Sequence, residues 1–97
     1  MNNIEWIQNW FKDNCDGEWE NIYGIEIGTL DNPGWYIKIE LTETKFSGIS
    51  MDEVIYDIAD DDWYRCIVKK NTFKGYGDVD KLDKLIEVFK HWIESNV

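Results

Sequence analysis

The sequence predicts an α+β fold in a single domain, residues 1–97, with an N-terminal helix, an antiparallel sheet of four or five strands and a C-terminal helix. Two observations predict it. Apolar residues recur at helical spacing near both ends of the chain, and between these segments they alternate with polar residues. Both helices are expected to pack on one face of the sheet, because a single antiparallel sheet commonly buries one face only. A chain of 97 residues supports one domain with a modest core.

The N-terminal helix is predicted over residues 3–12. Asn2 or Asn3 can cap its start, since an asparagine side chain accepts a backbone N–H there. Gly17 supplies the turn or left-handed position expected after its end. The apolar face of this helix consists of Ile4, Trp6, Ile7, Trp10 and Phe11.

A β-hairpin is the clearest feature of the middle of the chain. Its first strand is predicted over residues 22–30, which alternate apolar and other residues. The turn Asp31-Asn32-Pro33-Gly34 predicts type II geometry, because Pro33 fixes φ at the first central position and Gly34 accepts a positive φ at the second. The second strand places Trp35, Ile37, Ile39 and Leu41 on one face and Tyr36, Lys38 and Glu40 on the other.

The segment after the hairpin holds two or three further strands. Residues 42–50 are polar and small and indicate a loop, whereas 51–58 are ambiguous between strand and helix, with strand favoured by β-branched and aromatic residues. Asp60-Asp61-Asp62 indicates a turn. A strand over 63–68 and a short strand over 72–76 follow, joined by a turn at Lys69-Lys70-Asn71. The first of these strands has an apolar face of Tyr64, Cys66 and Val68.

The C-terminal helix has the strongest periodicity in the chain. Asp78 is predicted as its N-cap, and Asp80 and Asp83 put negative charge near its N-terminus, where the helix dipole favours it. Its apolar face consists of Leu82, Leu85, Ile86, Phe89, Trp92 and Ile93.

Charge and hydropathy disfavour two classes of function, nucleic-acid binding and insertion into a membrane. Twenty Asp and Glu against ten Lys and Arg leave a net charge of −10, which disfavours a nucleic-acid partner because such domains carry basic surfaces. No apolar run is long enough for a membrane span, and the N-terminus lacks the pattern of a secretory signal. Two cysteines far apart in sequence do not form a disulfide framework, so we expect reduced thiols and a cytoplasmic location.

The residues that usually carry catalysis or metal binding are scarce. His91, the one histidine, is expected on the solvated side of the last helix. Cys66 is expected in the core, and acidic neighbours of Cys15 raise its pKa rather than activating it. The acidic run at 13–18 fails the EF-hand pattern, because Lys12 stands at the first ligand position. We therefore expect no catalytic residue, no metal and no cofactor.

What remains is a surface for a protein partner. Negative charge is concentrated in residues 13–20 and 52–62, each with an aromatic residue in or beside it. Aromatic side chains anchor interfaces, and surplus charge accelerates association with an oppositely charged partner. The open sheet face is expected to carry Glu26, Tyr36, Lys38, Glu40, Arg65 and Trp63. The predicted partner-binding residues are Asp16, Glu18, Trp19, Glu20, Trp35, Tyr36, Asp57, Asp60, Asp61, Asp62 and Trp63.

These segments also resemble a known family, over nearly the whole chain from Trp6 to Trp92. The motifs that carry the resemblance are Cys15-Asp16-Gly17-Glu18-Trp19-Glu20, Tyr23-Gly24-Ile25, Leu30-Asp31-Asn32-Pro33-Gly34-Trp35, Asp61-Asp62-Trp63 and Phe73-Lys74-Gly75. They are similar to the immunity protein 53 family of bacterial polymorphic toxin systems. The resemblance implies a small cytoplasmic protein, made beside a toxin in bacterial competition, that binds the toxin and protects the producing cell.

The first hypothesis is therefore a stoichiometric inhibitor of a cognate toxin. The carboxylates of 13–20 and 57–62 would meet a basic toxin surface, with Trp19 and Trp63 as anchors and the inhibitor a monomer or weak homodimer. A nuclease fits such a partner, because its substrate groove is basic. The alternative is a small enzyme or ligand-binding domain in which Glu18, Glu20 and Asp62 converge in a pocket. A third possibility is an acidic assembly module that buries the open sheet face in a homo-oligomer.

Overall fold

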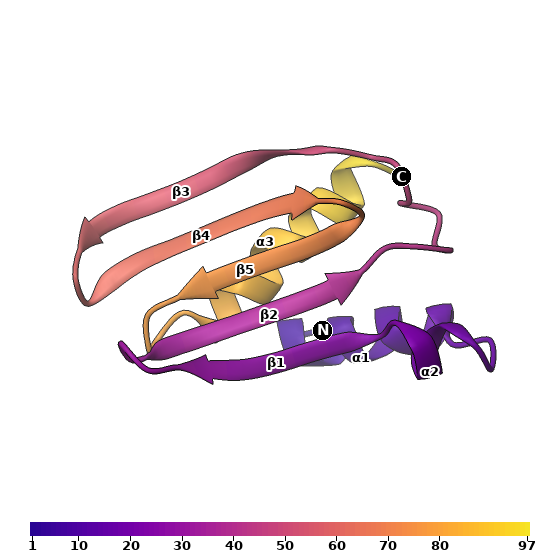
Figure 1. Ribbon diagram of the computed structural model, residues 1–97, viewed down its shortest axis with the longest axis horizontal. Helices are drawn as coiled ribbons and strands as arrows, with labels where there is room; N and C mark the ends of the chain where they lie inside the picture. Colours follow the sequence, from indigo (N-terminus) through magenta and orange to yellow (C-terminus); the bar gives the residue numbers. More distant parts are fainter.

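The computed structural model describes all 97 residues and contains three helices and five strands. In chain order they are α1 (Asn3–Asn14), α2 (Trp19–Ile22), β1 (Ile25–Leu30), β2 (Gly34–Glu40), β3 (Met51–Ala59), β4 (Asp62–Lys69), β5 (Thr72–Gly77) and α3 (Leu82–Ser95). The strands form one antiparallel sheet in the order β1-β2-β5-β4-β3, and α1 and α3 lie on one face of it (Figure 1). The predicted α+β architecture is confirmed.

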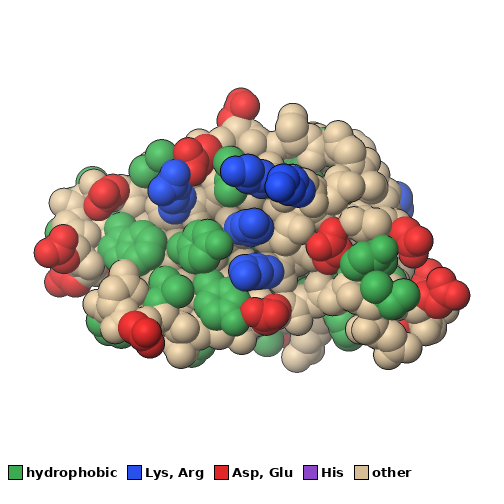
Figure 2. All heavy atoms as spheres, viewed as in Figure 1, with side chains coloured by type: hydrophobic (Ala, Val, Ile, Leu, Met, Phe, Trp, Pro, Cys, Tyr) green, Lys and Arg blue, Asp and Glu red, His purple; other side chains and the backbone are tan.

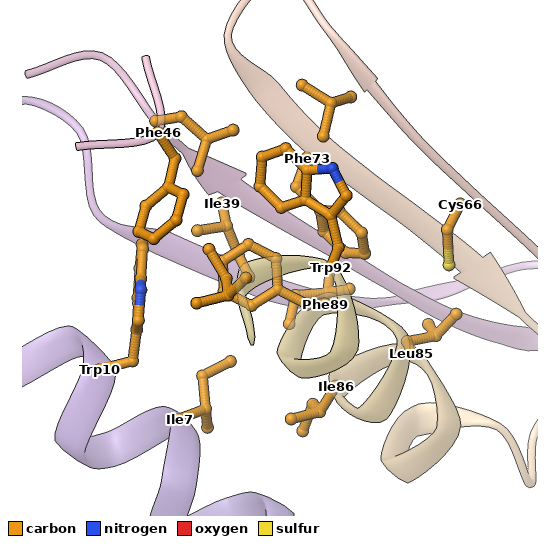
Figure 3. Packing of buried hydrophobic residues seen from close by; sticks show 14 of the residues in the cluster. Ile7, Trp10, Ile39, Phe46, Cys66, Phe73, Leu85, Ile86, Phe89 and Trp92 are labelled. Carbon is orange, nitrogen blue, oxygen red and sulfur yellow. The ribbon is translucent and has the colours of Figure 1, made fainter. Parts of the chain in front are cut away.

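The core lies between the sheet and the two long helices (Figure 3). Phe89 of α3 is at its centre, with ring centroids 5.0 Å from Trp10 and 4.9 Å from Phe73. Such edge-on and tilted aromatic pairs add to the stabilisation that burial provides. The strands and helices contribute mainly aliphatic and aromatic side chains: Ile7, Trp10, Ile37, Ile39, Cys66, Val68, Phe73, Leu85, Ile86, Phe89, Trp92 and Ile93.

The alternation in β2 is confirmed, because Ile37 and Ile39 are fully buried while Lys38 between them is exposed. The ambiguous segment at 51–58 is a strand, β3, at one edge of the sheet, with irregular register at two places along its pairing with β4. The loop at 42–50 is also confirmed. It is tied to the core by Phe46, whose ring centroid lies 6.0 Å from that of Trp92.

Three local predictions are wrong. The turn after β1 is not type II: Gly34 has no positive φ, belongs to β2 and pairs with Leu30, and the preceding Asn32–Pro33 bond is cis. Glycine is needed at this position for another reason, since a Cβ there would lie 2.2 Å from the carbonyl oxygen of Gly77. The first strand begins at Ile25 rather than residue 22, because α2 occupies 19–22.

The third wrong prediction concerns the helix caps. Asn2 caps α1 as expected, with its Oδ1 accepting the Glu5 N–H at 2.8 Å. Asp78 does not cap α3, whose N-cap is Lys81. Asp78 instead begins a turn, in which its carbonyl oxygen accepts the Lys81 N–H at 3.1 Å, and its side chain is used for other contacts.

None of the helices has the length and apolar character that crossing a membrane requires.

Candidate protein-binding surface

The carboxylates of 13–20 and those of 57–62 lie at opposite ends of the molecule. Its longest dimension is 40 Å, and the α1–α2 connection occupies one end of that axis while the β3–β4 hairpin occupies the other (Figure 1). The carboxylates of 13–20 and 57–62 therefore do not form one continuous surface. Glu18 and Glu20 also do not converge with Asp62, as the pocket alternative required.

The β3–β4 end brings several predicted residues together. Asp57 stands opposite Trp63 in the β3–β4 ladder, and the exposed Asp60 and Asp61 form the turn between the strands. A shallow hollow of about 400 Å³ is lined by Asn32, Asp57, Ala59, Asp60 and Trp63. We name Asp57, Asp60, Asp61 and Trp63 the hairpin tip. None of its three carboxylates forms an ion pair within the chain.

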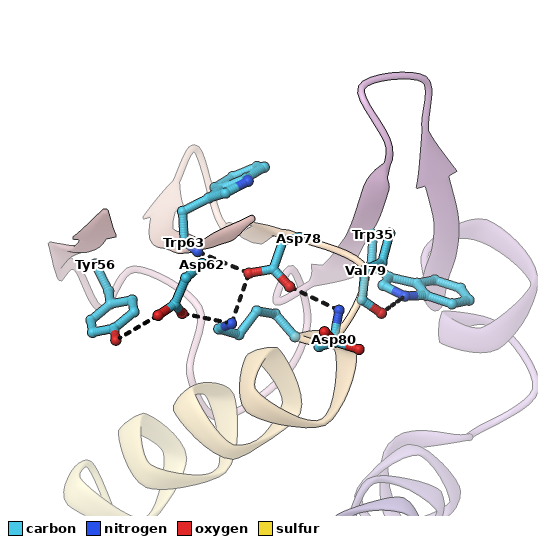
Figure 4. Close-up of polar contacts among 8 residues, drawn as sticks. Trp35, Tyr56, Asp62, Trp63, Asp78, Val79 and Asp80 are labelled. Atoms are coloured by element: carbon cyan, nitrogen blue, oxygen red, sulfur yellow. Dashed lines mark hydrogen bonds and ion pairs between the residues drawn. The ribbon is translucent and has the colours of Figure 1, made fainter. Parts of the chain in front are cut away.

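The neighbouring Asp62 serves the fold. Its carboxylate lies 2.9 Å from the Lys81 ammonium and accepts a hydrogen bond from the Tyr56 hydroxyl at 3.3 Å (Figure 4). The same ammonium lies 2.7 Å from Asp78, whose carboxylate also accepts the backbone N–H of Trp63 at 2.8 Å. This network ties the start of β4 to the beginning of α3. Asp62 was predicted to bind the protein partner, but its carboxylate is already paired with Lys81 and Tyr56 within the chain.

Burial and charge oppose each other at Asp78. Burial alone would raise the pKa of this carboxyl group, but hydrogen bonds from the Lys81 side chain and from the N–H groups of Trp63 and Asp80 lower it. The same pairing with Asp78, and then with Asp62, raises the pKa of Lys81. Neither Asp78 nor Lys81 was predicted as part of a site. Their contact was not visible in the sequence, because an Asp three residues before a Lys is ordinary near a helix start.

Carboxylates at the other end organise the α1–α2 connection. Asp16 Oδ1 accepts the N–H groups of Glu18 at 3.0 Å and Trp19 at 2.9 Å, which lowers the Asp16 pKa, with the Trp19 bond contributing more. Glu20 accepts the N–H groups of Asp16 at 3.0 Å and Gly17 at 2.9 Å. Of these predicted binding residues, Asp16 and Glu20 thus hold the loop, whereas the exposed side chain of Glu18 has no hydrogen bond within the chain.

Trp19 is not a surface anchor, and this prediction is wrong. Its side chain is 1% exposed, and its ring packs at centroid distances of 5.8 Å against Trp10 and 5.7 Å against Phe11. The short helix α2 turns Trp19 toward α1 and into the core. Its indole Nε1 is buried without a hydrogen-bond partner.

Trp35 and Tyr36 are neighbours in β2 that point to opposite faces of the sheet. The Trp35 indole N–H donates to the Val79 carbonyl oxygen at 3.0 Å, which ties β2 to the segment before α3 (Figure 4). Tyr36 lies on the open face, where its hydroxyl donates to Glu26 at 2.5 Å. This hydrogen bond to Glu26 is the largest cause of the raised Tyr36 pKa.

The open sheet face has the composition expected from the alternation, with additional cations. Adjacent strands place Glu26 beside Lys38 and Lys74, and Tyr36 beside Tyr76 and Arg65. Lys and Arg side chains gather across the middle of this face, with hydrophobic side chains next to them (Figure 2). Lys74 and Tyr76 were missed as surface residues, although the strand at 72–76 and its alternation could have placed them there.

Neither cysteine is an activated nucleophile. Burial raises the pKa of Cys66 to about 12, which leaves this thiol protonated and unreactive. Burial, followed by the charges of Glu20 and Asp16, also raises the pKa of Cys15. His91 and Ser95 line an open groove of about 680 Å³ between β3 and α3, but the Ser95 hydroxyl donates to the His91 carbonyl oxygen rather than to its ring. No group of three His, Cys, Asp or Glu side chains is arranged to hold a metal ion.

The structure is that of a small α+β protein with two long helices on one face of a five-stranded antiparallel sheet. The chain belongs to the immunity protein 53 family, whose sequence model matches residues 4–94, so the predicted resemblance is confirmed. Comparisons with curated proteins and with solved structures gave no match.

Proposed function

We propose that this protein neutralises a cognate bacterial toxin by binding it, and that the hairpin tip is the main contact. Membership of the immunity protein 53 family over residues 4–94 is the observation that carries the first part. The second part rests on the hairpin tip, where Asp57 and Asp60 line a hollow with Trp63 and Asp61 lies in the adjoining turn, all three carboxylates without an ion pair.

The chemistry of the tip fits a basic partner. Asp57, Asp60 and Asp61 are exposed and have no cation within the chain to neutralise them. Unpaired surface charge of this kind attracts an oppositely charged protein and raises its association rate. The half-buried ring of Trp63 provides the apolar contact that interface hot spots typically need.

The tip is held in place before binding. Asp62 and the backbone N–H of Trp63 are fixed through Lys81 and Asp78 to the start of α3. A contact surface that is already ordered loses less conformational entropy on binding, which favours affinity. The network therefore supports recognition even though its own charges are paired within the chain.

The mechanism that follows is steric and electrostatic. A nuclease toxin carries a basic groove for the phosphates of its substrate, and an acidic protein complements that groove. The immunity protein would occupy the groove as a one-to-one complex in the cytoplasm of the producing cell. It would act as a monomer or weak homodimer, and neutralisation would need no catalysis.

Co-expression with the product of the adjacent gene tests this proposal. The neighbour alone should arrest growth, and co-expression of this chain should restore it, with both proteins recovered as one complex by size-exclusion chromatography. A harmless neighbour, or rescue without a complex, would contradict toxin neutralisation by binding. Rescue with a complex that is unaffected by changes at the hairpin tip would contradict only the assignment of the contact.

A further inference from the structure

The open sheet face carries cations at its centre, although the chain as a whole is strongly acidic. Lys38 of β2 and Lys74 of β5 are direct neighbours in the ladder, and Lys69 lies on the same face near the end of β4. None of these three ammonium groups forms an ion pair within the chain. They stand on three adjacent strands, so their positions relative to one another are fixed by the ladder.

Carboxylates are also present on this face, and those nearest its centre have partners, whereas Asp57 at the end of the face belongs to the hairpin tip. Glu26 accepts the Tyr36 hydroxyl, and Glu40 accepts the hydroxyls of Thr42 at 2.6 Å and Thr72 at 2.9 Å. Glu53 pairs with Arg65. Glu40 has a partner on each carboxylate oxygen, and Glu26 and Glu53 each have one on Oε2. The charged donors without a partner at the centre of the face are the lysine ammonium groups.

An aromatic and aliphatic surface adjoins the cations (Figure 2). Tyr36 and Tyr76 are cross-strand neighbours next to the two lysines, and the Lys38 ammonium lies 5.5 Å from the centre of the Tyr36 ring. Ile55 follows on the edge strand opposite Arg65, with 61% of its surface exposed. We name Lys38, Lys74, Lys69, Tyr36 and Tyr76 the sheet patch. Rigid tyrosines beside donors without partners are typical of a protein interface.

We infer that the sheet patch binds a carboxylate-rich segment of the toxin, as a second contact on a different face from the hairpin tip. The inference rests on the proposed function for the identity of the partner. The lysines would meet its Asp or Glu side chains, and the tyrosines would pack against its apolar residues. The toxin would thus present a basic surface to the tip and an acidic segment to the sheet.

Charge favours a carboxylate-rich segment of the toxin over two other possible occupants of the sheet patch. A second copy related by a two-fold axis through the patch would place Lys38 and Lys74 against the same lysines, which like charges oppose. A nucleic acid needs a track of cations along its phosphates, but this patch is short and bordered by Glu26, Glu40 and Glu53. The distant acidic ends do not prevent a local contact, because physiological salt screens charges beyond ~8 Å.

Two probes at physiological salt test the inference. The first is the toxin from the adjacent gene, measured by calorimetry. Lys38→Gln/Lys74→Gln should weaken its binding by about tenfold, through the loss of charge-assisted contacts. The matched control is Lys12→Gln/Lys45→Gln, which makes the same charge change at exposed positions outside the patch and should leave the affinity within about twofold.

The second probe does not depend on the toxin. A labelled poly-glutamate peptide should shift the NMR amide signals of β2 and β5 in the wild type but much less in Lys38→Gln/Lys74→Gln, and an oligo-dT of equal length should shift neither. Peptide binding without toxin neutralisation would contradict the proposed function and leave the sheet patch supported. Preferential oligo-dT binding, equal effects of the patch and control variants, or no shift in these strands would overturn the inference.

Discussion

The ammonium group of Lys81 lies 2.7 Å from the carboxylate of Asp78, which is only 2% exposed just beyond the end of β5. The same ammonium lies 2.9 Å from Asp62 at the start of β4. One cation therefore joins the end of the sheet, the β3–β4 hairpin and the beginning of α3. This arrangement fixes the base of the hairpin tip.

Replacing Asp78 should destabilise the fold. Asp78→Asn keeps the shape of the side chain but removes its charge, so the bonds to Lys81 and to the N–H groups of Trp63 and Asp80 weaken. We expect the free energy of unfolding, measured by urea denaturation, to fall by about 2 kcal/mol. Lys84→Met, which breaks the exposed pair with Glu87 on the same helix, should change it by less than about 0.5 kcal/mol. Equal effects of the two variants would contradict a structural role for Asp78.

The stabilisation by Asp78 should depend on pH. The pKa of this group is lower in the folded protein than its unfolded value of about 3.9. A lowered folded pKa contributes stability that is present above the unfolded value and is lost as the pH falls through the folded value. The stability difference between wild type and Asp78→Asn should therefore be constant above about pH 5 and shrink below about pH 4. Urea midpoints across this range measure it, and a difference that persists at low pH would argue against the ion pair.

Trp19 and Trp63 should respond to truncation in opposite ways. Trp19→Ala removes a buried indole from the contact with Trp10 and Phe11, and such truncations cost about 3–5 kcal/mol. Trp63→Ala acts on a half-buried ring at the hairpin tip, so we expect a smaller loss of stability and a larger loss of toxin affinity. Thermal unfolding and calorimetric titration with the toxin separate the two effects. If the Trp19→Ala protein is stable but binds the toxin more weakly, Trp19 is an interface anchor and not a core residue.

Local periodicity accounts for the parts of the fold that could be predicted. The alternation in β2 identified Ile37 and Ile39 as core residues, and the spacing in α3 identified Phe89 and Trp92, because burial on one face leaves a repeat in the sequence. The same alternation placed Tyr36 on the open face. These elements needed no knowledge of distant contacts.

The residues that were predicted incorrectly owe their positions to contacts between distant segments. Trp19 stands in a helix of four residues, which is too short to show periodicity, and its burial follows from the position of α1. Gly34 was assigned to a turn, whereas its lack of a side chain serves the close approach of Gly77. The α1–α2 connection and the β3–β4 turn lie at opposite ends of the molecule, which separates the carboxylates of 13–20 from those of 57–62, and no feature of either segment indicates that separation.

Neutralising the hairpin tip should slow toxin association. Asp57→Asn/Asp60→Asn/Asp61→Asn removes three exposed charges but leaves Asp62 on Lys81, so the fold should be retained. We expect the association rate at low salt to fall by about tenfold and its salt dependence to weaken, with a smaller change in the dissociation rate. Stopped-flow measurements across a range of salt concentrations give both rates.

The control for this variant must remove the same amount of negative charge without touching the tip. Glu5→Gln/Glu43→Gln/Glu94→Gln removes three negative charges from exposed positions outside both acidic segments. If the local field at the tip steers the toxin, this control should associate nearly as fast as the wild type at physiological salt, because charges farther than ~8 Å from the contact are screened there. Equal slowing of both variants would instead show that steering depends on the total charge of −10 and not on the hairpin tip.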